Sequence, residues 1–313
     1  MSRGPSPEGN GAGHRPVRVV AVGGGHGAAQ SLRAARRYAT EVTGIISVAD
    51  DGGSSGRLRE LLGIPAPGDL RRCIGALLPD ESPLGAALEH RFEHGELAGH
   101  AFGNLLIAAL AATTGDFAAG VAETARLAGA VGRVFPATTT PVVLTGRGEG
   151  GELSGQVAIT RRGGVSRVDI VPADARPPAG AVEALLEADQ IVIGPGSLYT
   201  SLLAATAVRS LREAIRESPA QVVYVANLRE QRPETAGADV ADHVRALLDH
   251  GLRLDAVLAD PSALALGDLP AALRVELAPV ADPALAAHDP ELLAAALSSL
   301  LRSGIACVDT ERA

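Results

Sequence analysis

Residues 17–28 carry the sequence VRVVAVGGGHGA, in which a run of mostly β-branched residues leads directly into a glycine-rich turn. Val17 to Val22 has the composition of a buried strand, and the residues from Ala28 to Tyr38 have the apolar spacing of a helix. A strand, a glycine turn and a helix in this order form the first half of a βαβ unit. This stretch therefore predicts an α/β fold built on a mainly parallel sheet.

The same order of elements returns later in the chain. Further strands are predicted over residues 42–48, 190–193 and 221–226, and each ends in a glycine-rich or polar turn. Right-handed crossovers place the turns that follow parallel strands at one edge of the sheet, and ligands of such sheets bind at that edge. We therefore expect a Rossmann-like three-layer core, with residues 17–313 as a single domain and residues 1–16 as a disordered tail.

A segment around residues 84–172 departs from this alternation of strands and helices. Helices are expected over residues 84–94, 101–112 and 117–130. Strands with an antiparallel pattern are expected over residues 142–144, 153–160 and 165–171. The segment is therefore predicted as a helical and antiparallel insertion beside the main sheet. Two further amphipathic helices are expected over residues 239–250 and 290–301.

The composition excludes several classes of protein. All 28 basic residues are arginine, so the chain lacks the lysine that Walker-type phosphate loops, protein kinases and Schiff-base or pyridoxal-phosphate enzymes require. A net charge of −8, with no tryptophan, three tyrosines and four phenylalanines, argues against nucleic-acid binding. Cys73 and Cys307 make no disulfide framework, and no apolar run is long enough to span a membrane. We therefore expect a cytoplasmic protein with no nucleic-acid partner.

The first glycine turn is a candidate phosphate-binding loop. Gly23, Gly25 and Ala28 satisfy the pattern G-x-G-x-x-A between a strand and a helix. Bare backbone lets a phosphate approach, and the free N–H groups at the start of a helix can hold it. The predicted ligand-binding residues here are Gly24, Gly25, His26 and Gly27, with a simple tight turn as the alternative.

Two adjacent carboxylates end the second predicted strand. Asp50 lies 25 residues after Gly25, close to the position of the acidic residue that binds a ribose in dinucleotide folds. Asp50 and Asp51 could instead coordinate Mg²⁺, or lie in a solvated turn. No catalytic residue is assigned, although these two carboxylates would be the candidates in an enzyme.

A run of small polar residues follows, with the sequence GGSSGR over residues 52–57. It combines flexible backbone, two hydroxyls and a guanidinium, which together are typical of an anion-binding nest. The candidate ligand-binding residues are Gly53, Ser54, Ser55 and Arg57. Arg57 could equally pair with Glu60 on one face of a helix.

Two further polar groups stand at predicted helix starts. Asp69 is expected to cap a helix in which Arg71 or Arg72 meets a phosphate, with a surface ion pair as the alternative. His100 and Asn104 share one face of a helical turn, where they would line a pocket or form a satisfied buried pair.

A second glycine loop, GPGSLYTS over residues 194–201, follows the strand predicted at 190–193. It again places backbone and hydroxyls at the start of a helix, and two such loops in one sheet are more specific than one. The candidate ligand-binding residues are Gly194, Pro195, Gly196, Ser197, Leu198 and Thr200, together with Asn227 at the end of the next strand. No Ser-His-Asp, Cys-His or zinc-binding pattern occupies a motif position.

Together these motifs resemble the YvcK/CofD-like family, and within it the YvcK-type gluconeogenesis factors. The resemblance rests on the strings VADDGGSSGR at residues 48–57 and GPGSLYTS at residues 194–201, and it extends over about residues 17–251. Shorter matches lie at residues 67–71, 99–106, 114–117 and 227–235. The chain departs from the family pattern at His26, at residues 229–230 and 236–238, and around Ala287.

The resemblance implies a Rossmann-like cytoplasmic protein that binds UDP-sugars such as UDP-N-acetylglucosamine. It also implies a role in gluconeogenic growth, in cell shape and in cell-wall peptidoglycan synthesis. We expect no required cofactor, with Mg²⁺ as an option, and we expect a homo-oligomer that acts on an unknown protein partner. The sister branch implies one alternative, a Mg²⁺-dependent 2-phospho-L-lactate transferase of cofactor F420 synthesis. The departures from the pattern keep open another, a degenerate paralogue that serves as a scaffold.

Overall fold

The computed structural model describes residues 15–282, 284 and 287–310, with residues 304–310 described by backbone alone. Of the tail expected over residues 1–16, residues 1–14 lie outside the described range. The side chain of Cys307 lies outside it as well. Residues 15 and 16 lead into the first strand, and Arg15 forms an ion pair of 2.9 Å with Asp189 at the start of a neighbouring strand.

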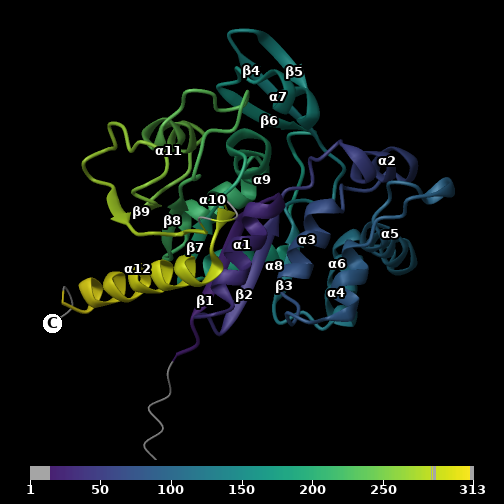
Figure 1. Cartoon of the computed structure of the whole chain (residues 1–313), viewed down its shortest axis with the longest axis horizontal. Helices are drawn as coiled ribbons and strands as arrows, with labels where there is room; N and C mark the ends of the chain where they lie inside the picture. The colour runs from purple at the N-terminus through teal and green to yellow at the C-terminus, as the bar shows by residue number, and fades with distance from the viewer. Residues whose placement is uncertain (1–14, 283, 285–286, 311–313) are drawn as a thin grey trace, which may run out of the picture.

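A seven-stranded sheet forms the centre of the molecule (Figure 1). Its order is β10-β9-β8-β7-β1-β2-β3, and every neighbouring pair is parallel. The strands are β1 Arg18–Gly23, β2 Glu41–Ile46, β3 Arg133–Pro136, β7 Gln190–Ile193, β8 Gln221–Val225, β9 Ala256–Ala259 and β10 Arg274–Leu277. Because helices cover both faces, the inner strands are apolar throughout rather than alternating. This arrangement confirms the predicted α/β fold.

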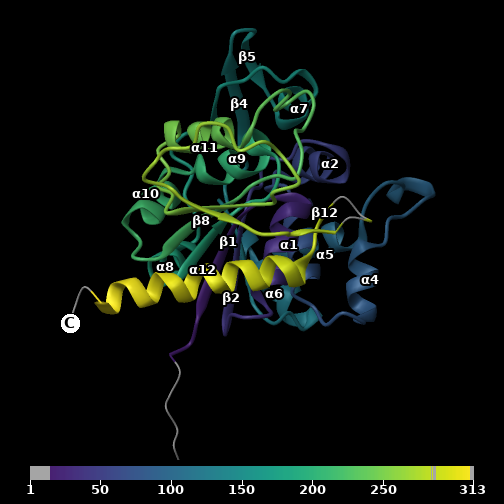
Figure 2. The ribbon, with the colours of Figure 1, turned by 60° about the vertical axis from the view of Figure 1, so that its left-hand side comes forward.

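Helices flank the sheet (Figures 1 and 2). α1 packs against α3 and against the long C-terminal helix α12, while α8 packs against α10. These helices are α1 Gly25–Ala35, α3 Gly68–Ala76, α8 Ala179–Leu186, α10 Arg209–Glu217 and α12 Pro290–Thr310, and the remaining helices of the main body are α2 Gly53–Leu62, α9 Leu203–Thr206 and α11 Val240–Asp249. No helix in the described part of the chain is both long and apolar enough to cross a membrane.

Residues 84–172 contribute two groups of elements and one strand of the main sheet. The helices α4 Pro83–Glu89, α5 Phe102–Thr114 and α6 Phe117–Ala128 come first, and α6 then leads into β3. A small antiparallel sheet in the order β5-β4-β6 follows and stands at the top of Figure 1 with α7. Its elements are β4 Val143–Gly148, β5 Gly151–Ser154, α7 Gln156–Arg162 and β6 Arg167–Val171.

Two of the expected elements end in the structure well before the predicted residue. The helix expected over 84–94 ends at Glu89. The chain then forms a loop that returns at Phe102, whose amide donates a hydrogen bond to the carbonyl of His90. The strand expected over 153–160 was wrong beyond Ser154. Gly155 has a φ of 97°, which turns the chain into α7. The carboxylate of Asp51 then accepts a hydrogen bond from the amide of Val157 and caps that helix from 106 residues away.

Buried histidines link α11 to the rest of the fold. The Nδ1–H group of His250 donates to the carbonyl of Ala246, and its Nε2 atom accepts a hydrogen bond of 3.1 Å from the amide of Val168 in β6. Nε2 can accept only when the ring is neutral. Burial lowers the pKa of His250, and burial also lowers the pKa of His243 and His288. Burial therefore favours the neutral form of these rings in the folded chain.

We expect the free energy of unfolding to fall as the pH is lowered from about 6.5 towards 5. Above about pH 6.5, the unfolded pKa of histidine, neutral His250 contributes its full stabilisation, and this is lost as the pH falls through the lowered pKa of the folded state. Each such group adds up to about 1.4 kcal/mol per pH unit to the slope. Urea denaturation over this range should give a shallower slope for His250→Gln than for the wild type.

The matched control is His94→Gln, because the side chain of His94 is 93% exposed. Its slope should equal that of the wild type. An unchanged slope in His250→Gln would contradict the assignment of the acid sensitivity to this ring.

Candidate functional site

A cavity of about 320 Å³ lies at the carboxyl edge of β1, β7 and β8. It is lined by the first glycine loop, by the second glycine loop and by the segment that follows β8. The lining residues are His26, Gly27, Gln30, Pro195, Gly196, Asn227, Leu228, Arg229, Gln231, Ala287 and His288. Five residues predicted from the sequence, namely His26, Gly27, Pro195, Gly196 and Asn227, therefore meet at one cavity.

The two glycine loops pack backbone against backbone. A Cβ atom on Gly27 would lie 1.9 Å from the carbonyl oxygen of Pro195, so any side chain at residue 27 would force the loops apart. Asn227 holds the second loop from the other side. Its Oδ1 atom accepts from the amide of Gly196, its Nδ2 atom donates to the carbonyl of Gly196, and both distances are 2.9 Å. Asn227 thus positions the loop that borders the cavity.

Asp69 has a different role from the predicted helix cap. α3 begins at Gly68, so Asp69 lies within the first turn. Its carboxylate lies against the first glycine loop and pairs with Arg72 at 2.8 Å. Burial raises the pKa of Asp69, and the charge of Arg72 opposes this shift. A Cβ atom on Gly24 would lie 2.8 Å from this carboxylate, so part of the loop already faces a protein anion.

A second buried carboxylate occupies the helix start that follows the second loop. Glu234 accepts hydrogen bonds from the amides of Tyr199 (2.8 Å) and Thr200 (3.1 Å), and from the hydroxyl of Thr200 (3.0 Å). These groups belong to the π-helical turn Leu198–Leu202. The Thr200 hydroxyl predicted to bind a ligand is therefore engaged by Glu234, and the side chain of Leu198 is buried in the core.

Burial raises the pKa of Glu234, while its three hydrogen bonds act in the opposite direction. The sequence analysis did not assign Glu234 to the site. Its carboxylate fixes the segment after β8, which supplies Arg229 and Gln231 to the wall of the cavity. Glu234 is therefore a positioning residue for that wall.

The residues predicted around α2 meet one another and lie apart from the cavity. The hydroxyl of Ser54 shares a hydrogen bond of 3.1 Å with Nδ1 of His100, and Nδ2 of Asn104 donates to the same hydroxyl at 3.0 Å. All three side chains are buried, and they join α2 to the start of α5. Arg57 donates to the carbonyl of Ala98 at 2.9 Å. Gly53, where α2 begins, and the buried Ser55 belong to the same helix.

The two predicted acidic ligands have separate backbone partners. Asp50 accepts a hydrogen bond from the amide of Gly52 at 2.9 Å, whereas Asp51 caps α7 through Val157. Asp50 also lies beside the start of α3, where a Cβ atom on Gly68 would be 3.7 Å from its Oδ2 atom, and its charge contributes to the raised pKa of Asp69. The described residues contain no group of three or more His, Cys, Asp or Glu side chains that could hold a metal ion. Arg71 is buried and pairs with Glu89 at 3.0 Å.

Six cavity residues were missing from the sequence-based set, namely Gln30, Leu228, Arg229, Gln231, Ala287 and His288. Gln30 lies one helical turn after His26 and could have been found from that spacing. Arg229 and Gln231 follow Asn227 closely and offered a weaker signal of the same kind. His288 comes from β12 Ala287–His288, which pairs with β11 Ala281–Asp282, and its Nε2–H group lies 3.1 Å from the carbonyl of Ala226. No local pattern predicts that contact.

Known proteins share this fold and these loops. A model of the family described as 2-phospho-L-lactate transferase CofD matches residues 19–276. The chain is 44% identical to a gluconeogenesis factor of Halalkalibacterium halodurans over 235 residues, which cover 74% of this chain and 73% of that protein. It is 41% identical to a gluconeogenesis factor of Bacillus subtilis over 241 residues, which cover 76% of each chain.

A crystal structure of a member of the UPF0052 family from Bacillus halodurans superposes with a TM-score of 0.85 at 35% identity. The match covers 91% of this chain and 99% of that one. The family match thus extends over both glycine loops and the segment after β8. The chain belongs to the CofD/UPF0052 family, which includes the gluconeogenesis factors.

Proposed function

We propose that this protein binds a nucleotide sugar of the UDP-N-acetylglucosamine type in the 320 Å³ cavity and acts as a regulatory gluconeogenesis factor. The observation that carries the proposal is the contact between the loops at Gly27 and Pro195, which gathers a helix start and three strand ends around one cavity. Its volume lies within the usual range of small-molecule sites. The similarity to gluconeogenesis factors supports the regulatory role.

The diphosphate of such a ligand would lie against the start of α1. The helix begins at Gly25, and the amides of its first turn carry a partial positive charge that favours anions. Asp69 lies against Gly24, while His26 and Gly27 line the cavity. The exposed guanidinium of Arg229 lies at the mouth and can reach a phosphate with a planar pair of donors.

The segment that carries Arg229 also offers a hydrogen-bond acceptor that a phosphate cannot satisfy. The side-chain oxygen of Gln231 is buried and has no hydrogen-bond partner within the described residues. Such an atom costs about 1–3 kcal/mol until a donor reaches it. A uracil ring supplies an imide N–H and an N-acetyl sugar supplies hydroxyls and an amide N–H, whereas inorganic diphosphate at neutral pH supplies few donors. Gln231 therefore favours the organic ends of a nucleotide sugar.

The position of the cavity wall that carries Arg229 and Gln231 supports a regulatory role. Arg229 and Gln231 lie on the segment between β8 and α11. Glu234 attaches this segment to the turn after the second glycine loop. A ligand that contacts both side chains would order this exposed segment for a protein partner. We propose that the output is the control of carbon metabolism, cell shape and cell-wall synthesis.

A second candidate is transfer of a phospholactyl group, which the description of the matching family favours. In this mechanism the acceptor hydroxyl attacks the phosphorus that carries the lactyl group and loses its proton, the bond from that phosphorus to the bridging oxygen breaks, and the nucleotide leaves as the monophosphate. Asp50 and the substrate phosphates would hold Mg²⁺, which would offset charge on the transferred group. Asp51 does not fit this role while it caps α7.

We expect titration calorimetry to detect UDP-N-acetylglucosamine binding that Arg229→Gln weakens by about 10- to 100-fold, because one charge-assisted hydrogen bond contributes about 1.5–3 kcal/mol. Arg232→Gln is the matched control, since Arg232 lies on the same segment but pairs with Glu230 and does not line the cavity. Absence of heat from the wild type at millimolar ligand would refute the proposal, and equal affinities for both variants would place the ligand elsewhere.

For the transferase candidate, we expect no turnover of a deazaflavin acceptor with a nucleotide-activated phospholactate in the presence of Mg²⁺. Chromatography of the deazaflavin product provides the measurement. Turnover in the wild type that is lost in Asp50→Asn and kept in Asp51→Asn would replace the regulatory proposal with the enzymatic one.

A further inference from the structure

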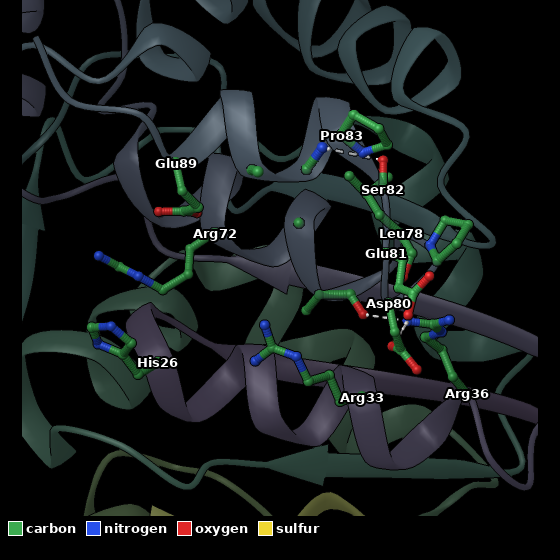
Figure 3. A pocket seen from close by; sticks show the side chains of 15 residues that line it. His26, Arg33, Arg36, Arg72, Leu78, Asp80, Glu81, Ser82, Pro83 and Glu89 are labelled. Carbon is green, nitrogen blue, oxygen red and sulfur yellow. Dashed lines mark hydrogen bonds and ion pairs between the residues drawn. The ribbon is translucent and has the colours of Figure 1, made fainter.

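A second and larger cavity, of about 680 Å³, runs as a groove between α1, α3 and α4 (Figure 3). It shares His26 with the cavity described above and extends away from it along α1. Small residues of α3, Gly75 and Ala76, form part of its lining and leave room between the helices. Neither the nucleotide-sugar proposal nor the transferase candidate uses this groove.

Two arginines stand at the end of the groove nearest His26. Figure 3 shows the side chains of Arg33 and Arg72 rising from α1 and α3 towards the space between the helices. Arg33 hydrogen-bonds to the Oε1 atom of Gln30 at 3.2 Å and has no acidic partner within the described residues. Arg72 bonds to Asp69 through one nitrogen at 2.8 Å, which leaves its other nitrogens for a further acceptor.

The acidic side chains around the groove have cationic partners or lie at its far end. Glu89 pairs with Arg71 at 3.0 Å, and Asp80 lies 4.0 Å from Arg36. Arg36 also donates to the carbonyls of Ala76 and Leu78, so it closes the far end structurally. Glu81 is exposed beside Asp80 at that same end. The end near His26 therefore keeps an excess of positive charge.

The titration of His26 agrees with this charge distribution. Partial burial and the charge of Arg72 lower the pKa of His26, with Arg33 and Arg71 acting in the same direction against Glu89. A positive potential at the mouth of the groove attracts anions. A phosphate group has three oxygens and can accept from two planar guanidinium groups at once, which a single carboxylate does less well.

We propose that this groove is a second ligand site, which binds a small phosphate-bearing metabolite with its phosphate held by Arg33 and Arg72. The site is adjacent to the nucleotide-sugar cavity across His26 but does not depend on it. The rest of the metabolite would extend over Gly75 and Ala76 towards the connection between α3 and α4.

Inorganic pyrophosphate serves as the probe, titrated calorimetrically at constant ionic strength. We expect Arg33→Gln to weaken its binding at least 10-fold. Ala86→Asp should do the same, because this exposed position lines the groove and would place a negative charge there. The matched control is Arg37→Gln, an exposed arginine one turn after Arg33 that pairs with Glu291 and does not line the groove.

Wild-type affinity for pyrophosphate in both Arg33→Gln and Ala86→Asp would overturn the proposal. Loss of pyrophosphate binding in Arg229→Gln but not in Arg33→Gln would also overturn it, because the probe would then occupy the other cavity. UDP-N-acetylglucosamine binding should be unchanged in Arg33→Gln and Ala86→Asp, so this site and the nucleotide-sugar site can fail separately.

Discussion

The contact of the Gly27 backbone with the carbonyl of Pro195 is the constraint on which the site depends. It excludes every side chain at residue 27 and brings the loops after β1 and β7 together at the carboxyl edge of the sheet. The side chain of Asn227 forms hydrogen bonds with both the amide and the carbonyl of Gly196, so the end of β8 is attached to the second loop. Three strand ends that are far apart in the chain thus form one rigid rim, and a cavity there needs no ligand to assemble it.

Two buried carboxylates complete this rim where other nucleotide sites place a lysine or a bound phosphate. Asp69 lies against the first glycine loop, and Glu234 accepts hydrogen bonds from the turn after the second. Glu234 thereby satisfies amides that would otherwise stay unpaired in the interior. Part of what looks in the sequence like a phosphate loop is therefore internal structure, and the surfaces left for a ligand are those at His26, Gly27 and Gly196.

Local patterns were enough to predict the strands, the two glycine loops and their meeting at one edge, because these depend on apolar runs and on the rule for parallel sheets. Local patterns could not show which carboxylate accepts hydrogen bonds from the amides of which helix start. Asp51 caps a helix 106 residues away, and Glu234 reaches back across a strand to Thr200. In the sequence such residues resemble ligands of a metal or a nucleotide, because the same chemistry serves both purposes. The spacing of His100 and Asn104 placed these two side chains together, but it could not show that both bond to Ser54.

The absence of lysine makes the arginines informative, since every fixed cation has the same chemistry. Around the two cavities they divide by their partners. Arg36 donates to two carbonyls and Arg71 pairs with a carboxylate, and these contacts join neighbouring helices. Arg33 and Arg229 have no acidic partner within the described residues, and each lies at a different cavity. A guanidinium that is left unpaired beside a concave surface has its donors available for an anion from outside, which is why the two ligand proposals rest on these positions.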